Sequence, residues 1–576
     1  MMFKSILIVA NSSRVPLNEI LKLSKDHNVY ILMLWPLDID LVNKLKKTSN
    51  VKITNSDDFI SENDHSKIAI EINRINKNWW QELFKIDELN ISGLKISKIF
   101  QYEFQRNFGK LFLNILSIKN ALKKLNINSI YFFENQREAY PNSFSEKFNE
   151  TKLSDLFSTH KEFNVYILKF EESLDFHWIK KRFKSYTLGE IYQKISYKYF
   201  SKQNKKNAIV ISNTTRCLSQ FIHIAELNNP ILILDDKDLM VSKNKFKISA
   251  NQVTGNLFFF DTEISLIFLN MYEFIIQTFS IKKEFYYSVI EFIKLNNPKL
   301  YITVNQFATN EIVKMWAFKN SGIRIALAPE GLGQPNRELS LVMDTIVCPD
   351  IDVERWLVSE ASYLNYYKDL NLKTRITGFL QYHFPQSKPK LNNNRITVFL
   401  GGTAQKHLFR PILHETIFGI IKFITDILDV FRDYPKTELI IKVHPGDYNK
   451  IHILKQLIKP YKKVKIIINA NSHNLIKNSD LIIAYDTSSV IESLAFNKNV
   501  VIYDYTDRTS YINSISEFLN NGLHITNTKV QLKNKIKFLI ENPLQTIDTS
   551  ELSMVLENHK KDYNINEIVN KLILDE

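Results

Sequence analysis

Short apolar runs, separated by polar turns and by stretches of helical spacing, make up most of the chain. Leu481 to Ala484 and Val500 to Tyr503 are such runs, and the apolar positions from Val490 to Phe496 between them recur at helical spacing. The order strand, turn, helix, strand is that of a βαβ unit, whose two strands run parallel. The predicted sheet is extended by runs at Arg395 to Leu400, Leu439 to Val443 and Val464 to Ile468.

The same alternation occurs earlier in the chain. Long helical patterns cover Ser66 to Phe84 and Ile96 to Leu125. Strands alternating with helices predict an α/β fold with parallel, doubly wound sheets. The strands predicted in this part are Ala208 to Ser212, Ile231 to Leu234, Leu300 to Val304 and Ile323 to Leu327.

Two pairs of segments are alike and occur in the same order. Ser5 to Arg14 matches Asn207 to Arg216, and Ile130 to Gln136 matches Leu300 to Gln306. In-order similarity indicates an internal repeat, so the first part of the chain is expected to be a degenerate copy of the part that follows. Chance similarity between strand-and-turn segments is the alternative.

The chain has 576 residues, too many for one hydrophobic core. A polar, lysine-rich stretch near residue 200 is the expected linker after the first unit. The segments predicted are an N-terminal α/β unit at 1–195, a Rossmann-like domain at 205–345, an interdomain crossing at 346–390, another Rossmann-like domain at 391–545 and a helical tail at 546–576.

Composition narrows the class of protein. Hydrophobic residues make up 44% of the chain, and the only cysteines are Cys217 and Cys348, so we expect a packed protein of the reducing cytoplasm. The most apolar stretches, Ile264 to Ile281 and Ile412 to Phe431, contain charged and amide residues. Such residues disfavour a membrane span, and both stretches are expected to be amphipathic helices.

The formal net charge of +14 favours anionic partners. Lysines are scattered, and neither a zinc-ligand spacing nor an RNA-recognition motif is present, so nucleic acid is not an expected partner. A basic enzyme that handles nucleotides fits better, with peripheral contact at the inner face of an anionic cytoplasmic membrane.

The turn after Ala484 holds the first candidate site. Polar residues from Asp486 to Ser489 precede a predicted helix. They can cap its N-terminus while its first backbone N–H groups remain able to bind an anion. The simpler alternative is that Thr487 or Ser488 only caps the helix.

Another polar turn ends the predicted strand at Val443. Pro445 cannot donate a ladder hydrogen bond and holds His444 in an extended conformation. The histidine therefore lies at the carboxyl end of a strand, where open α/β sheets bind ligands. Together with the serine turn, His444 is a candidate phosphate contact; a surface histidine is the alternative.

Glycine-containing turns follow two further predicted strands. Gly401-Gly402-Thr403 ends the strand at 395–400, and Pro329-Glu330-Gly331-Leu332-Gly333 follows the strand that ends at Leu327. Glycines permit a tight backbone that a phosphate or sugar can approach. The second turn presents Glu330 at a strand end, with a solvated loop glutamate as the alternative.

Three of these motifs together resemble those of a known family. Pro329-Glu330-Gly331, Lys442-Val443-His444-Pro445 and Thr487-Ser488-Ser489 with Glu492 resemble the D/E-D/E-G, HP and Ser/Thr-rich motifs of bacterial sialyltransferases and polysialyltransferases. The C-terminal part also resembles the wider group of capsule and teichoic-acid polymer transferases. The resemblance covers roughly residues 205 to 510. It implies a GT-B-like fold, in which an acceptor-side domain (205–345) faces a nucleotide-donor domain (391–545), here with an additional N-terminal α/β unit.

The resemblance also implies roles for individual residues. The donor in those enzymes is CMP-sialic acid; here Glu330 would be the general base on the acceptor hydroxyl, and His444 would assist the departing phosphate. Glu492 would face the ribose unless it is solvated. Pro329 replaces the leading acidic residue of the first motif, which leaves the donor sugar open. The full expected donor-binding set is Gly331, Gly333, Gly401, Gly402, Thr403, Lys442, Pro445, Thr487, Ser488, Ser489 and Glu492.

Glycosyl transfer needs a proton acceptor for the hydroxyl and stabilisation of charge on the leaving phosphate. No Asp-rich metal motif is present, so neither a metal nor another cofactor is expected. We predict an inverting, metal-independent glycosyltransferase. It would transfer sialic acid or another acidic sugar from a CMP-activated donor to a bacterial surface glycan or glycolipid, such as a capsule or lipooligosaccharide.

Alternatives from other classes stay open at this point. A CDP-glycerol-type polymer phosphotransferase would use the same HP and serine turns but transfer a phosphorus-containing unit. A UDP-sugar 2-epimerase would convert its substrate without an acceptor. A scaffold in a glycan-assembly complex would neither hydrolyse nor transfer a nucleotide sugar.

Overall fold

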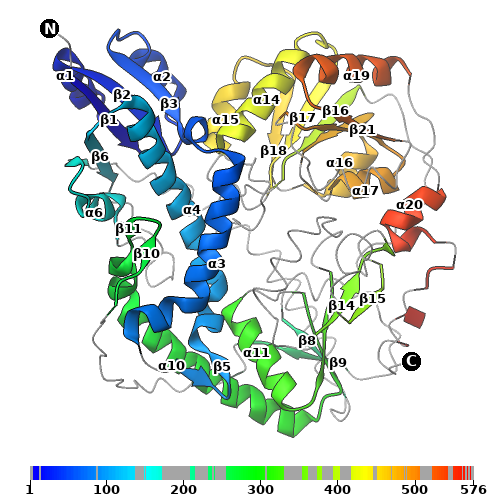
Figure 1. The fold of residues 1–576 in the computed structure, drawn as a ribbon. Coiled ribbons are helices and arrows are strands. Elements are labelled where there is room, and N and C mark those ends of the chain that lie inside the picture. The colour runs from blue at the N-terminus through cyan, green and yellow to red at the C-terminus, as the bar shows by residue number, and fades with distance from the viewer. Residues whose placement is uncertain are drawn as a thin grey trace.

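Three all-parallel β-sheets, one after another along the chain, form the framework of the protein (Figure 1). This parallel pairing, with helices in the crossovers, confirms the predicted α/β class with Rossmann-like domains. The computed structural model describes residues 4–11, 15–85, 88–135, 148, 151–170, 208–213, 231–236, 239, 255–304, 308–329, 353–360, 373–378, 394–401, 417–444, 451–468, 470–485, 487, 489–505, 522–542, 549–560, 562–564, 567–568 and 571.

The first unit, within residues 4–170, contains a sheet of strand order β3-β2-β1-β6-β7. The long helical patterns predicted in it are confirmed as α3 and α4. Its strands are β1 (Lys4–Ala10), β2 (His27–Met33), β3 (Val51–Asn55), β6 (Ser129–Asn135) and β7 (Asn164–Phe170), with a hairpin of β4 (Asn90–Ile91) and β5 (Leu94–Lys95). Its helices are α1 (Leu17–Asp26), α2 (Ile39–Leu45), the 3₁₀ turn η1 (Ser56–Phe59), α3 (Glu62–Phe84), α4 (Ile96–Leu125) and α6 (Leu153–Ser158).

The second domain has strand order β15-β14-β13-β12-β8-β9. Its strands are β8 (Ile209–Ser212), β9 (Ile231–Leu234), β12 (Leu300–Thr303), β13 (Arg324–Leu327), β14 (Glu354–Leu357) and β15 (Thr374–Ile376). It also holds the hairpin β10 (Phe258–Phe259) and β11 (Thr262–Glu263) and the helices α10 (Ser265–Asn296) and α11 (Thr309–Asn320). Residues 346–390, assigned above to a crossing, contain β14 and β15. Because β14 pairs with β13 and β15 pairs with β14, the second sheet extends beyond residue 345.

The third domain has strand order β18-β17-β16-β19-β20-β21. Every strand predicted in it is present, because buried parallel strands are short apolar runs that end at turns. Its strands are β16 (Arg395–Phe399), β17 (Glu438–Lys442), β18 (Val464–Ile467), β19 (Leu481–Ala484), β20 (Asn499–Tyr503) and β21 (Leu523–Thr526). Its helices are α14 (Ile417–Phe431), α15 (Ile451–Ile458), α16 (Ser472–Lys477), α17 (Ser489–Ala495) and α19 (Lys529–Glu541), followed by α20 (Thr549–Val555) and the 3₁₀ turn η4 (Glu557–His559).

The segments that are alike in sequence form equivalent strand pairs. β1 and β6 are neighbours in the first sheet, and β8 and β12 are neighbours in the second. Leu7 pairs with Ile130, and the residues that match them in the sequence comparison, Ile209 and Leu300, pair with each other. A one-residue slip would turn every side chain to the other face. The shared register therefore supports the repeat hypothesis.

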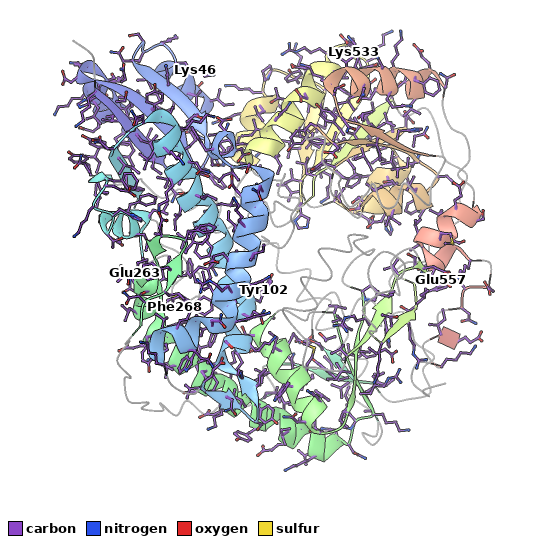
Figure 2. The ribbon with its side chains drawn as sticks, in the orientation of Figure 1. Lys46, Tyr102, Glu263, Phe268, Lys533 and Glu557 are labelled. Atoms are coloured by element: carbon purple, nitrogen blue, oxygen red, sulfur yellow. The ribbon has the colours of Figure 1, made fainter. Side chains whose placement is uncertain are left out.

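One continuous hydrophobic core joins the first unit to the second domain. Helices α3 and α4 contribute to it from one side, and α10 and α11 from the other. Trp79 of α3 stacks on Phe268 of α10 with ring centroids 5.1 Å apart; Phe268 is labelled in Figure 2. Trp316 of α11 donates from Nε1 to the carbonyl oxygen of Ser92 at 3.0 Å. The first unit and the second domain are thus packed as a single body.

The third domain has separate hydrophobic clusters of its own. The tail helix α20 leads back to the second domain: Leu552 and Val555 share a cluster with Val358, the residue after β14. The backbone N of Glu557 donates to the carbonyl of Val358 at 3.1 Å. In the part of the chain that the structure describes, no helix combines the length and apolarity needed to cross a membrane.

Candidate ligand site in the third domain

The strand order of the third sheet reverses between β16 and β19. From β16 the chain proceeds to β17 and β18 on one side, then returns to place β19, β20 and β21 on the other. Such a reversal opens a crevice beyond the carboxyl ends of the two central strands, where α/β sheets bind ligands. Gly401 follows β16 and Tyr485 follows β19. The predicted glycine and serine turns therefore begin on either side of this point.

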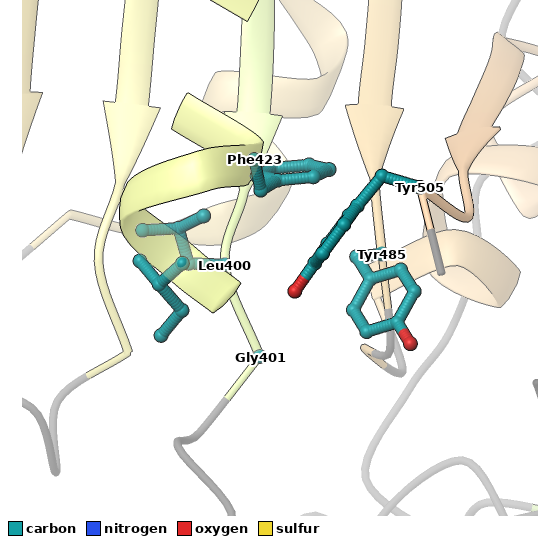
Figure 3. A pocket seen from close by; sticks show the side chains of 6 residues that line it. Leu400, Gly401, Phe423, Tyr485 and Tyr505 are labelled. Atoms are coloured by element: carbon teal, nitrogen blue, oxygen red, sulfur yellow. The ribbon is translucent and has the colours of Figure 1, made fainter. Parts of the chain in front are cut away.

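A small hollow lies at this reversal (Figure 3), lined by Leu400, Gly401, Ile420, Phe423, Tyr485 and Tyr505. The rings of Tyr485 and Tyr505 lie side by side with centroids 5.6 Å apart. The Lys422 ammonium lies 5.7 Å from the Tyr505 centroid. Lys422 also pairs with Asp426 at 2.7 Å, so the feature that suits a ligand here is the aromatic face, which fits a flat group. Sequence reasoning missed these tyrosines, although each follows a predicted strand.

The serine turn adopts a capping geometry in its described part. The backbone N of Ser489, the first residue of α17, donates to Thr487 Oγ1 at 3.4 Å, and Thr487 N donates to the carbonyl of Tyr485 at 2.9 Å. Ser489 itself is buried. Thr487 thus makes the contact that the capping alternative expects, at the edge of the sheet where an anion was expected to bind.

The basic residue of the HP motif points into the protein. Lys442 is buried, and its Nζ donates to the carbonyl oxygens of Ile468 at 2.7 Å and Val443 at 3.1 Å. Burial lowers the pKa of this amine, and the nearby Glu492 opposes the shift. Its bonds are to backbone, so the described geometry gives Lys442 a positioning role between β17 and β18. His444 follows, half-buried, at the carboxyl end of β17.

Glu492 of α17 is buried, with 7% of its surface exposed, so the solvated alternative for this residue is wrong. Burial raises the pKa of its carboxyl group to about 7, and Lys442 opposes the rise. His473 of α16 lies with Nε2 3.7 Å from Glu492 Oε2, and burial lowers the pKa of that imidazole. Because burial favours the neutral form of both groups, they are not a charged pair near neutral pH.

Several predicted site residues lie outside the described residues, and their placement stays a prediction: Glu330, Gly331, Gly333, Gly402, Thr403, Pro445 and Ser488. The described residues that flank them show the edges involved. Gly401 follows β16, His444 follows β17, Thr487 follows β19, and Pro329 follows β13 of the second sheet.

A buried polar network that sequence reasoning missed lies at the carboxyl ends of β8 and β12 in the second sheet. Glu311, near the start of α11, accepts hydrogen bonds from Ser212 Oγ (2.7 Å), Tyr301 OH (2.7 Å) and Thr303 Oγ1 (2.9 Å). It also pairs with Lys314 of the same helix. The sequence feature that could have indicated this network is the presence of hydroxyl residues, such as Ser212 and Thr303, in otherwise apolar strands.

The network extends to the surface at Asp236. Lys314 Nζ lies 2.9 Å from Asp236 Oδ1, and the Asp236 side chain is 39% exposed. Burial acts to lower the pKa of Lys314, but the carboxylates of Glu311 and Asp236 outweigh it and the pKa is raised. Within the described ranges, no group of three or more His, Cys, Asp or Glu side chains is arranged to hold a metal ion.

Neither a family model nor a curated protein matches the sequence. Among solved structures, the chain is similar to UDP-GlcNAc 2-epimerase from Methanocaldococcus jannaschii in complex with UDP-GlcNAc and UDP: 13% identity, 64% of this chain, 99% of that chain, TM-score 0.41. The S. aureus MnaA–UDP structure is 13% identical, covers 65% of this chain and 97% of its own, and has a TM-score of 0.40. The glycosyltransferase SnogD from Streptomyces nogalater is 10% identical, covers 65% of this chain and 100% of its own, and has a TM-score of 0.37. Likenesses this distant do not indicate an activity for this chain.

Proposed function

We propose that this chain is a glycosyltransferase that binds a nucleotide-activated sugar at the carboxyl edge of the third sheet. One observation carries the proposal: Gly401, His444 and Thr487, picked out from three separate motifs, follow β16, β17 and β19, which are consecutive in the sheet. Parallel neighbouring strands end at the same edge. The described residues of the three motifs therefore lie near the strand-order reversal, the part of such sheets that binds nucleotides, and this supports the proposal.

Different residues near the carboxyl ends of the strands would supply the different parts of the transfer reaction. The partly exposed Tyr505 ring would offer a flat face to a base or sugar ring, and His444 with the turn before α17 would stabilise charge on the leaving phosphate. Glu330 would remove the acceptor proton, as proposed from its motif. The finer proposal, a CMP-linked acidic sugar passed to a surface glycan without a metal, rests on the motif resemblance.

The acceptor side is proposed to be the carboxyl edge of the second sheet. Val358, directly after β14, packs with α20 and with the cluster that includes α17 of the third domain. The carboxyl edge of the second sheet thus adjoins the third domain at this point. A donor held by one edge and an acceptor held by the other would meet between the domains, as in two-domain ligand sites generally.

A nucleotide screen tests the proposal. The purified chain is heated with CMP, CDP, UDP, GDP or CMP-sialic acid, and the unfolding midpoint is recorded. A ligand that binds only the folded state at 100 times its dissociation constant raises the free energy of unfolding by about 2.7 kcal/mol. The response should be lost in His444→Ala and retained in His452→Ala, which removes an exposed histidine of α15 in the same domain.

The result separates the finer proposal from the coarser one. Selective stabilisation by CMP compounds supports the acidic-sugar donor, whereas preference for UDP or GDP overturns it and keeps the nucleotide-sugar site. No response to any nucleotide refutes the site. With a donor identified, Glu330→Ala should lower turnover about 100-fold or more; conversion of a UDP-sugar to its 2-epimer without acceptor would refute the transferase in favour of an epimerase.

A further inference from the structure

A buried tryptophan of the first unit contacts the third domain. Trp35, two residues after β2, is buried in a cluster with Ile417 and Ile453 of the third domain. Beside it, the backbone N of Ile39 approaches Gln456 Oε1 of α15 at 3.5 Å. This cluster is separate from the core that joins the first unit to the second domain. We call it the Trp35 contact.

The Trp35 contact falls on the two helices that lead out of the candidate ligand turns. Ile417 is the first residue of α14, the next described helix after β16 and Gly401. Ile453 lies in the first turn of α15, the next helix after β17 and His444. A side chain that contacts both helix starts holds α14 and α15 in place relative to each other and to the first unit.

The internal repeat allows the position of Trp35 in the first unit to be compared with the matching position in the second domain. Ala10 of β1 matches Ser212 of β8 in the sequence comparison. Ala10 pairs with Met33, and Ser212 pairs with Leu234. Counting two residues beyond each partner places Trp35 in the first unit where Asp236 stands in the second domain.

The same edge thus carries opposite chemistry in the two copies. In the second domain it is polar: Asp236 accepts from Asn310 Nδ2 at 2.5 Å and pairs with the buried Lys314. In the first unit the corresponding stretch holds Leu34, Trp35 and Leu37, all buried. An apolar edge packed on another domain cannot also receive a polar ligand.

We infer that the first unit positions the third domain, and that Trp35 is the positioning residue through which it acts. The first unit and second domain form one body, so Trp35 transmits the position of that body to the starts of α14 and α15. The tail, through Val358 and Glu557, supplies a further attachment of the third domain. Among the described residues, the third domain is thereby held to the rest of the chain at both of these contacts.

Hydrogen exchange of the full chain tests this inference. Loss of a buried anchor tryptophan from an interface costs enough to change an opening equilibrium about tenfold or more. In Trp35→Ala, exchange of the hydrogen-bonded amides of α14 and α15, which lie beyond the first turn of each helix, should therefore rise about tenfold. It should stay near the wild-type rate in Trp35→Phe, which keeps a buried ring, and in Trp316→Ala, which removes a tryptophan between the first unit and the second domain.

The outcomes are distinct. Unchanged exchange in α14 and α15 of Trp35→Ala overturns the inference, as does faster exchange confined to β1 and β2, which would make Trp35 only a core residue of the first unit. The same variant should bind the selected nucleotide about tenfold more weakly with the same nucleotide preference; this part rests on the proposed function. If the wild type binds no nucleotide, the proposed function fails while the exchange rates still decide the role of Trp35.

Discussion

Changing Glu492 to glutamine should remove a pH dependence from the stability of the third domain. The carboxyl group is buried, and its pKa is raised from the ordinary 4.5 to about 7 because burial disfavours the charged form. At about 1.36 kcal/mol per pKa unit, this rise corresponds to roughly 3 kcal/mol. The folded domain binds a proton in this pH range that the unfolded chain has released.

The bound proton sets the direction in which stability changes with pH. For an acid whose pKa is raised on folding, stability is greatest below about pH 4.5, falls as the pH rises and levels off above about pH 7. Glutamine carries no titrating group, so the variant should lack this decline. The difference in unfolding free energy between Glu492→Gln and wild type should therefore shift in favour of the variant by about 3 kcal/mol between pH 4.5 and pH 8.

The assay must report on the third domain alone. Urea titrations at pH 5, 6, 7 and 8, read by hydrogen exchange in peptides from β19 and β20, meet this need. The control is Glu438→Gln on β17. A hydrogen bond from Lys465, followed by one from Arg395, lowers the pKa of Glu438, so the stability contributed by that carboxyl is lost as the pH falls. Parallel pH profiles for wild type and Glu492→Gln would refute the reasoning.

Two further substitutions test the joint core and the buried network. A Cβ at Gly255 would lie 1.8 Å from the carbonyl oxygen of Glu82, so Gly255→Ala should lower the free energy of unfolding, measured by urea titration, by about 2 kcal/mol. In the control Gly322→Ala, the new Cβ meets no atom within 4 Å, and the positive φ alone should cost about 1 kcal/mol. Equal losses in the two variants would contradict the steric argument. Glu311→Ala leaves Lys314 buried without its nearest carboxylate and should cost about 3 kcal/mol or more; a calorimetric loss below about 1 kcal/mol would show that the network is not needed for stability.

The strands of the third sheet and the ends at which its candidate ligand turns begin could be predicted from the sequence. Runs such as Leu481 to Ala484 are buried on both faces of a parallel sheet, which requires a short, continuous apolar stretch, and polar or glycine residues end each run. The register of the repeat was accessible in the same way, because matching residues recur at fixed offsets along β1 and β8. Strand positions, strand ends and the register of the repeat depend on residues close together in the chain, so a local sequence pattern predicts them.

Other features depend on residues brought together over long distances. Glu311 meets Ser212, 99 positions away, and Trp35 meets Ile417 and Ile453 of another domain. No spacing along the chain indicates either contact. The environment of Glu492 likewise follows from its burial beside β17 and α16, and the same sequence motif on an exposed helix face would leave an ordinary carboxylate. The sequence by itself determined strands β16 to β20 of the third sheet, their order along the chain and the candidate turns. Only the tertiary structure decided which of those residues are buried, because burial depends on which surfaces pack together.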